Sequence, residues 1–232
     1  MSQNTYEDYY REYLGLFSQE SQLSHVVIQS KYRDLPINNK HYYPVIISQI
    51  NDTKVCSCSE KYYELCKCSF DGTIESLQNS RFQWSKLHRY SISESNDYTP
   101  NLVLPLNESL LRSVSFNIHN DIEAYIESKR DILSDARQFA YIENHRILST
   151  AFISDIYCSG CNIVVYTDPD FRSKGYGRQT VNACINWCLS NRLLPIYLVE
   201  ETNTSSIRLA EALGFKLMNT EWALMEIERN PI

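Results

Sequence analysis

Apolar and aromatic residues recur at helical spacing near the start of the chain, and strand-like patterns follow them. Over residues 5–17, tyrosine, leucine and phenylalanine return every three or four positions, and Thr5 with Asp8 forms a capping-box pattern, which predicts a helix. The apolar runs at 44–50 and 54–58, separated by an Asn-Asp turn, predict two strands. Residues 59–68 and 74–88 are expected to be helical.

Strand and helix patterns alternate in the second half of the chain. Strands are predicted at 139–142, 146–157, 161–167, 196–199 and 222–227, and helices at 120–133, 175–191 and 204–213, with a Glu143-Asn144 turn between the first two strands. Residues 91–105 lack a regular pattern and contain two prolines, so we expect a linker or a long surface loop there. These patterns predict an α/β protein (α+β, with a mixed sheet), divided into a smaller N-terminal α/β region, 1–110, and a second domain, 120–232.

Composition excludes some classes of function. No apolar run approaches the roughly 20 residues that span a bilayer, and the first residues lack the pattern of a signal peptide, so a cytoplasmic protein without a membrane partner is expected. The formal net charge of the 232-residue chain is −6, which disfavours nucleic acid as a partner.

The eight cysteines allow two interpretations. They lie at Cys56, Cys58, Cys66, Cys68, Cys158, Cys161, Cys184 and Cys188. The first four, or the Cys-Ser-Gly-Cys segment, could form a zinc site. Against this, the Cys-x-Cys spacing is not that of zinc ribbons, and no second Cys-x-x-Cys is present. Cys184 and Cys188 are spaced as small core residues on an apolar helical face. Reduced, structural cysteines and no bound metal are therefore expected.

The segment 164–177 has the order of an anion-binding site. An apolar strand leads into a loop, and the loop leads into a helix that begins at Gly175 and Gly177. Free backbone N–H groups and the positive end of a helix dipole would meet an anion there, and glycine lets the backbone approach it closely. Arg172, Lys174 and Arg178 add positive charge, so the segment predicts a pyrophosphate site. The Rossmann fingerprint and the P-loop both require residues that are missing here.

Two separated elements together resemble the GNAT acetyltransferase superfamily. The first is the Arg-x-x-Gly-x-Gly pattern that starts at Arg172, and the second is Asn203-Thr204-Ser205-Ser206 followed by Leu213-Gly214-Phe215. Asn203 also fits a helix N-cap, and Gly214 fits the position after a helix end. The resemblance covers roughly residues 137–229, and its finer pattern is similar to the branch that includes the zwittermicin A resistance proteins. It implies a GNAT fold in the C-terminal half and acetyl-CoA, or another acyl-CoA, as co-substrate.

The resemblance also implies which residues contact the acyl-CoA. Two parallel strands, 161–167 and 196–199, would splay apart, the pantetheine arm would pair with the first of them, and a backbone N–H near Val164 or Val165 would hold the developing oxyanion. The residues expected to bind the co-substrate are Val164, Val165, Tyr166, Arg172, Ser173, Lys174, Gly175, Tyr176, Gly177, Arg178, Asn203 and Ser206.

The residues that usually move the proton in this superfamily are absent from their usual places. Asn162 stands where many relatives carry a glutamate, and Ala210 stands where many carry a tyrosine. Glu200, at the end of the second splayed strand, is the best substitute base by position, although a solvated loop carboxylate is the more common role for such a residue. Glu201 and Tyr197 are the next candidates, and His145 is expected to be structural. The reaction can also rest on proximity, with an already neutral amine attacking.

Three functions follow, in order of preference. The first is an N-acyltransferase that moves an acetyl or longer acyl group from acyl-CoA to a primary amine of a small molecule or peptide by direct attack. The second is a non-catalytic acyl-CoA sensor or pseudoenzyme, which Asn162 and Ala210 suggest. The third is a zinc-dependent interaction protein built on the N-terminal cysteines. Homodimer formation is left open.

Overall fold

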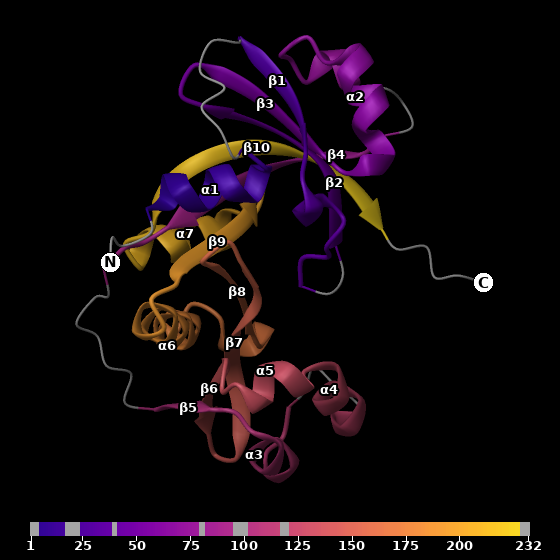
Figure 1. The fold of residues 1–232 in the computed structure, drawn as a ribbon. Helices are drawn as coiled ribbons and strands as arrows, with labels where there is room; N and C mark the ends of the chain where they lie inside the picture. The colour runs from indigo at the N-terminus through magenta and orange to yellow at the C-terminus, as the bar shows by residue number, and fades with distance from the viewer. Residues whose placement is uncertain are drawn as a thin grey trace.

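One large sheet contains strands from both the N-terminal and the C-terminal half of the chain. The structure, a computed structural model, describes residues 5–16, 24–38, 41–78, 82–94, 102–116 and 121–227. Across these residues ten strands pair in the order β1-β3-β2-β10-β4-β9-β8-β7-β6-β5. Most neighbours are antiparallel, whereas β1–β3 and β8–β9 are parallel. The sheet is therefore mixed, as the sequence predicts, and it twists strongly from β1 to β5 (Figure 1).

The strands and helices have the following bounds. The strands are β1 (His25–Gln29), β2 (His41–Ile50), β3 (Thr53–Cys58), β4 (Trp84–Ser91), β5 (Val103–Pro105), β6 (Gln138–Glu143), β7 (Arg146–Tyr157), β8 (Gly160–Thr167), β9 (Leu194–Glu200) and β10 (Lys216–Ile227). The helices are α1 (Tyr6–Leu14), α2 (Tyr63–Ser69), α3 (Glu108–Ser113), α4 (Ile122–Ser128), α5 (Arg130–Ser134), α6 (Tyr176–Ser190) and α7 (Thr204–Ala212).

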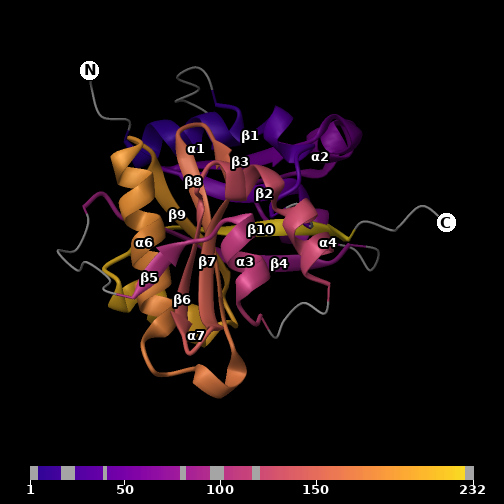
Figure 2. The same ribbon diagram turned by 90° about the horizontal axis from the view of Figure 1, so that it is seen from below.

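Helices cover both faces of the sheet. On one face, α6 and α7 pack against β7, β8 and β9 through Val181, Cys184 and Ala210. On the other face, α1 covers β2, β4, β9 and β10, while α3, α4 and α5 cover β6 and β7. Figure 2 shows α6 beside the strands on one side and α3 and α4 on the other. The loops that follow β8 and β9, 169–175 and 201–203, lie largely on the surface.

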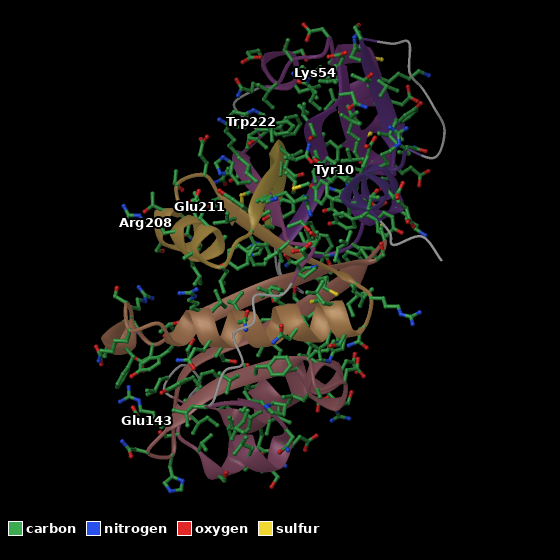
Figure 3. The ribbon with its side chains drawn as sticks, turned by 90° about the vertical axis from the view of Figure 1, so that its left-hand side faces the viewer. Tyr10, Lys54, Glu143, Arg208, Glu211 and Trp222 are labelled. Atoms are coloured by element: carbon green, nitrogen blue, oxygen red, sulfur yellow. The ribbon has the colours of Figure 1, made fainter. Side chains whose placement is uncertain are left out.

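A buried ion pair fixes α1 against the sheet. Arg89 of β4 and Glu221 of β10 meet with an Nη2–Oε1 distance of 2.7 Å, and their side chains are 3% and 0% exposed. The Tyr10 hydroxyl donates to Glu221 Oε2 at 2.7 Å, and Arg89 Nη1 donates to the Tyr9 hydroxyl at 2.9 Å. Figure 3 shows Tyr10 on α1 and Arg208 and Glu211 on α7, on opposite sides of β10.

Most predicted elements are confirmed, and one is wrong. Thr5 caps α1 in a capping box with Asp8. The helices and strands predicted after residue 120 are present, with two differences. The helix predicted at 120–133 is two short helices, α4 and α5, and the strand predicted at 222–227 begins at Lys216 in β10. Residues 74–88 were expected to be helical, but only a short 3₁₀ turn at Glu75–Leu77 is present, and β4 begins at Trp84. Strand β4 is central and pairs with both β9 and β10, so tertiary pairing overrides the local pattern. The sequence patterns also missed β1 and α3.

The segment 91–105, predicted to be a linker or a surface loop, begins and ends in strands. Ser91 closes β4, and Val103–Pro105 forms the edge strand β5, which pairs with β6. Residues 95–101 lie outside the described residues. The division into domains at 1–110 and 120–232 stays a prediction, although β2 and β4 from the first part pair with β10 from the second.

The cysteines lie mostly in the core. Cys184 and Cys188 are fully buried on α6, as predicted for small core residues. Cys56, Cys58 and Cys66 are also buried, where β3 meets α2, while Cys68 is exposed. Within the described ranges, no cluster of three or more His, Cys, Asp or Glu side chains is arranged to hold a metal ion. Among the helices of these same ranges, none has the length and apolar character needed to span a bilayer.

Candidate active site

The sheet opens between β8 and β9. These parallel strands pair only at their starts, where Gly160–Asn162 faces 194–196, and the last matched pair is Asn162 with Ile196. Beyond this point β8 continues to pair with β7, and β9 continues to pair with β4. The backbone edge of β8 from Ile163 to Thr167 therefore faces a gap rather than a strand. An extended chain, such as a pantetheine arm, could hydrogen-bond there as an added strand.

The N-terminus of α6 lies at the end of β8. Gly175 is its N-cap, and no side chain caps the helix. The N–H groups of Tyr176, Gly177 and Arg178 in the first turn therefore point out of the helix without an intrahelical acceptor. The preceding loop holds Arg172, Ser173 and Lys174 on the surface. Free N–H groups, the helix dipole and these cations make the loop suited to an anion.

The two glycines of this loop serve different purposes. Gly175 has φ +83° and nothing within 4 Å of an added Cβ, so it supplies a left-handed backbone and leaves open space in front of the helix. A Cβ on Gly177 would stand 2.9 Å from Thr167 Oγ1, so this glycine allows α6 to approach β8. Close approach of a ligand to the backbone stays a prediction for both glycines, and of the two only Gly175 has open space in front of it.

An ion pair and an aromatic ring brace the loop. The Asp168 carboxylate accepts from Arg146 Nη2 at 2.7 Å and from the Asp170 backbone N–H at 3.1 Å. Phe171 lies between two cations, with the Arg146 guanidinium carbon and Lys174 Nζ each 4.8 Å from its ring centroid. Arg172 Nε donates to the Thr167 carbonyl at 3.3 Å. These contacts hold the loop in position before any ligand arrives.

The contribution of the Arg146–Asp168 ion pair to stability should depend on pH. The hydrogen bond from Arg146 holds the pKa of Asp168 below its ordinary value of 3.8. A depressed folded-state pKa contributes stability above the ordinary value, and that stability is lost as the pH falls toward the folded value. We expect Asp168→Asn to reduce this acid-dependent loss, measured as the free energy of unfolding in urea between pH 3 and pH 6. The same loss with pH in the variant would contradict the assignment.

The family is shown by comparison of the sequence with known families. A family model described as GNAT acetyltransferase matches residues 14–223, which include both the opened strands and the N-terminal half. The chain belongs to the GNAT acetyltransferase family. The match extends well beyond the stretch 137–229 on which the sequence resemblance rested. No curated protein matches the sequence.

One solved structure shares the fold of this GNAT family member, and two others are weaker matches. An acetyltransferase of the GNAT family from Colwellia psychrerythraea superposes with a TM-score of 0.55 and 11% identity, covering 80% of this chain and 65% of that chain. A GCN5-related N-acetyltransferase-like protein from Streptococcus suis is 17% identical with a TM-score of 0.45, covering 66% of each chain. Ribosomal-protein-alanine N-acetyltransferase from Brucella melitensis is 15% identical with a TM-score of 0.41, covering 54% of this chain and 99% of that one. The match spans slightly under two thirds of each of the first two chains.

The second GNAT element begins at Asn203. Its Oδ1 accepts from the Ser206 backbone N–H at 3.2 Å, so Asn203 is the N-cap of α7, as the sequence predicts. Ser206 hydrogen-bonds to Tyr197, which is 4% exposed beneath α7. Burial raises the pKa of the Tyr197 hydroxyl above its ordinary value. The Ser206 hydroxyl is therefore directed toward Tyr197 and β9.

The two sequence-based acid–base candidates lie on opposite faces of the sheet. Tyr197 packs with Val181 and Ala210 on the α6 and α7 face. Glu200 is exposed and stands opposite Leu87, which packs on the α1 face. Glu201 is held by Lys86, with an Nζ–Oε1 distance of 2.6 Å, and this contact lowers the pKa of its carboxyl. The structure thus does not bring Tyr197 and Glu200 together at one point.

The remaining predicted residues follow the opened strand. Val164, Val165 and Tyr166 lie on β8 beyond its last pairing with β9, and Val165 faces α6 while Val164 faces the opposite side. Tyr176 stacks on Tyr141 of β6 with ring centroids 4.3 Å apart. His145 lies in the β6–β7 turn, at φ 58°. One polar residue that sequence reasoning missed, Asp155 of β7, lies directly opposite Asn162.

Proposed function

We propose that this protein is an N-acyltransferase that moves an acetyl or longer acyl group from acyl-CoA to a primary amine of a small molecule or peptide. The observation that carries the proposal is the opening of β8 from β9 beside the uncapped N-terminus of α6. The opened edge of β8 offers backbone hydrogen-bonding groups to an extended arm, and the N-terminus of α6 offers N–H groups to a pyrophosphate. Acyl-CoA has both of these parts, connected in the same order.

Different segments of this chain would bind different parts of the acyl-CoA donor. The N–H groups of 176–178 and the side chains of Arg172, Lys174 and Arg178 would bind the pyrophosphate. The β8 edge from Val164 to Tyr166 would bind the pantetheine arm, and its N–H groups would stabilise the oxyanion that forms when an amine attacks the thioester. Asn203 and Ser206 would border the arm from α7. The open space in front of Gly175 fits such a ligand, because no atom beyond its chain neighbours and its own helix backbone lies within 4 Å of a Cβ built there.

A finer placement is also part of the proposal. The strand and helix patterns around 161–167 and 203–206 are similar to those of the branch that includes zwittermicin A resistance proteins. The family match from residue 14 onward supports a role for the N-terminal half in a substrate pocket. We propose a small-molecule or peptide amine as the acceptor on this basis.

Release of free thiol from acetyl-CoA tests the proposed activity. Purified protein is incubated with acetyl-CoA and a panel of primary amines, amino acids and lysine peptides, and thiol is followed with a chromogenic disulfide reagent. We expect amine-dependent thiol release with at least one class of acceptor, and formation of the acetylated amine by mass spectrometry. Reactions without amine correct for hydrolysis. Acetyl-CoA binding without turnover on any amine would instead favour a non-catalytic sensor.

A further inference from the structure

A buried carboxylate lies next to the point where the sheet opens. Asp155 is 8% exposed, and it sits on β7, a strand whose neighbouring positions are mostly apolar. The β7–β8 register shifts between Ile153 and Asp155, so Ser154 is an extra residue and Asp155 stands opposite Asn162. Such a bulge turns the side chain after it to the other face of the sheet. Asn162 is also the last residue of β8 that pairs with β9.

The Asp155 carboxylate is held by a small hydrogen-bond network. Its Oδ2 accepts from the Ser154 hydroxyl at 2.6 Å and from the Asn38 backbone N–H at 2.9 Å. Asn162 Nδ2 donates to Ser154 Oγ at 3.0 Å, which connects the carboxylate to β8. The Tyr157 hydroxyl donates to the Pro36 carbonyl at 3.1 Å, so the N-terminal segment 36–38 closes over this part of β7. Asp155 is thus held on the same face of the sheet as Asn162.

A cavity lies against this network. It has a volume of about 530 Å³ and is lined by Ser154, Asp155, Tyr157, Lys129, Ile132 and Arg137, among others. That volume falls in the range of pockets that bind small molecules. The cavity lies between β7 and the α4–α5 turn, on the face opposite to α6. Asp155 is the part of its lining that stands opposite Asn162, the last residue of β8 that pairs with β9.

We propose that Asp155 is the general base of acyl transfer and that this cavity receives the amine-bearing acceptor. The inference rests on the proposed N-acyltransferase function and deepens it. Many superfamily members carry a glutamate at the position of Asn162. Here that position holds an amide, and Asp155 supplies a carboxylate from the opposite position on the neighbouring strand β7. Directly opposite residues have Cβ atoms about 5 Å apart, a distance that one water molecule can bridge.

Each proton in the reaction then has a destination. The ammonium form of the acceptor passes one proton to the Asp155 carboxylate, directly or through one water. The neutral nitrogen forms a bond to the acyl carbon, the carbon–sulfur bond breaks, and the sulfur leaves as a thiol with the second proton of the nitrogen. The third hydrogen stays on the new amide. Asp155 then releases its proton to solvent, so each cycle yields an amide, a thiol and one proton.

The surroundings of Asp155 make its carboxylate a stronger base than that of an exposed aspartate. Burial raises the pKa of its carboxyl above the ordinary value of 3.8, and the hydrogen bonds from Ser154, Asn38 and Asn162 offset only part of this effect. The charged and titratable groups that line the cavity with it are Glu127, Lys129, Arg130, Asp131, Arg137 and Tyr157. Of these, Lys129 acts on Asp155 in the opposite direction to burial and lowers its pKa. A base must be ionised to act, so activity should fall as the pH drops through this raised pKa.

The test compares Asp155→Asn with wild-type protein in three measurements. With an amine that supports thiol release, we expect kcat/KM to fall about 10²- to 10⁴-fold and its acidic limb to disappear. We expect the Kd for acetyl-CoA, measured by calorimetry, to stay within about twofold of wild type. We also expect Tm at pH 7 to be equal or higher. A raised folded-state pKa means that the ionised carboxylate destabilises the fold above that pKa, and the amide removes this cost.

Two further variants make the experiment specific. D155N/N162D exchanges the two side chains across the strand pair, and we expect it to regain at least tenfold in kcat/KM over Asp155→Asn. Asp52→Asn, on the exposed β2–β3 turn, is the matched control and should behave as wild type. Wild-type kcat/KM and an unchanged acidic limb in Asp155→Asn, particularly with activity lost in Glu200→Gln, would overturn the inference about Asp155 alone. An exchange variant as inactive as Asp155→Asn would do the same.

Failure of the proposed function has a different signature. It would show as wild-type protein that binds acetyl-CoA and acylates no amine in the panel. Equal loss of acetyl-CoA affinity and of activity in Asp155→Asn would assign Asp155 a structural role and overturn its role as a base.

Discussion

Replacing Gly177 with glutamate should strongly weaken the binding of acetyl-CoA. The new carboxylate would stand in the first turn of α6, beside the N–H groups that we assign to the pyrophosphate. At about 6 Å and an effective dielectric constant of about 20, two like unit charges repel by roughly 3 kcal/mol, which corresponds to about 100-fold in Kd. Calorimetric titration with acetyl-CoA measures this change.

The contact between Gly177 and β8 calls for a matched control. Any side chain at this position meets Thr167 Oγ1, because a Cβ would lie 2.9 Å from it. Gly177→Ala makes that contact without adding a charge, so the difference between the two variants isolates the electrostatic effect. Gly177→Glu should bind at least about 100-fold more weakly than Gly177→Ala. Equal affinities in the two variants would contradict a pyrophosphate site at this helix end.

Removing the buried carboxylate of Glu221 should destabilise the protein strongly. Glu221→Leu leaves the Arg89 guanidinium buried without its anion, and it removes the acceptor of the Tyr10 hydroxyl. Breaking a buried ion pair from one side typically costs about 3–5 kcal/mol. The free energy of unfolding, measured in urea by circular dichroism, should fall by about this amount.

The double replacement Arg89→Met with Glu221→Leu controls for the loss of one charge only. Replacing both partners with apolar side chains removes the uncompensated charge, so much of the stability should return. The exposed pair of Arg112 and Glu123 offers a second comparison, and Glu123→Gln should cause no comparable loss. A small effect of Glu221→Leu, within about 1 kcal/mol of wild type, would show that α1 does not depend on the ion pair.

The fold was predictable wherever local pattern and tertiary structure agree. The capping box at Thr5, the Asn51-Asp52 turn and the Gly175 helix start carry their signals within a few residues. Strand β4 does not, because Lys86, His88 and Arg89 resemble the polar face of a helix. Arg89 is buried only because Glu221, far along the chain, neutralises it. A contact between two residues so far apart in the sequence cannot be predicted from a short stretch around either of them.

Some residues of the candidate site were likewise predictable from local sequence, and one was not. The glycine-containing loop at 172–178 and the Asn203 cap are short motifs with a direct physical basis, and they lie directly after β8 and β9. Asp155 could not be found from spacing, because its place opposite Asn162 depends on a bulge at Ser154. The one charged residue within the stretch 147–157 was the available signal. The position of Asp155 relative to Asn162 follows only from the pairing of β7 with β8.

A crystal structure with acetyl-CoA bound tests most directly the claim that the opened strands and the α6 N-terminus form a donor site. We expect the pyrophosphate within hydrogen-bond distance of the N–H groups of Tyr176, Gly177 and Arg178. We expect the pantetheine arm along β8 from Val164 to Tyr166, with the thioester near Asn162 and the cavity beside Asp155. A pyrophosphate bound elsewhere, or a pantetheine arm outside the gap between β8 and β9, would contradict it.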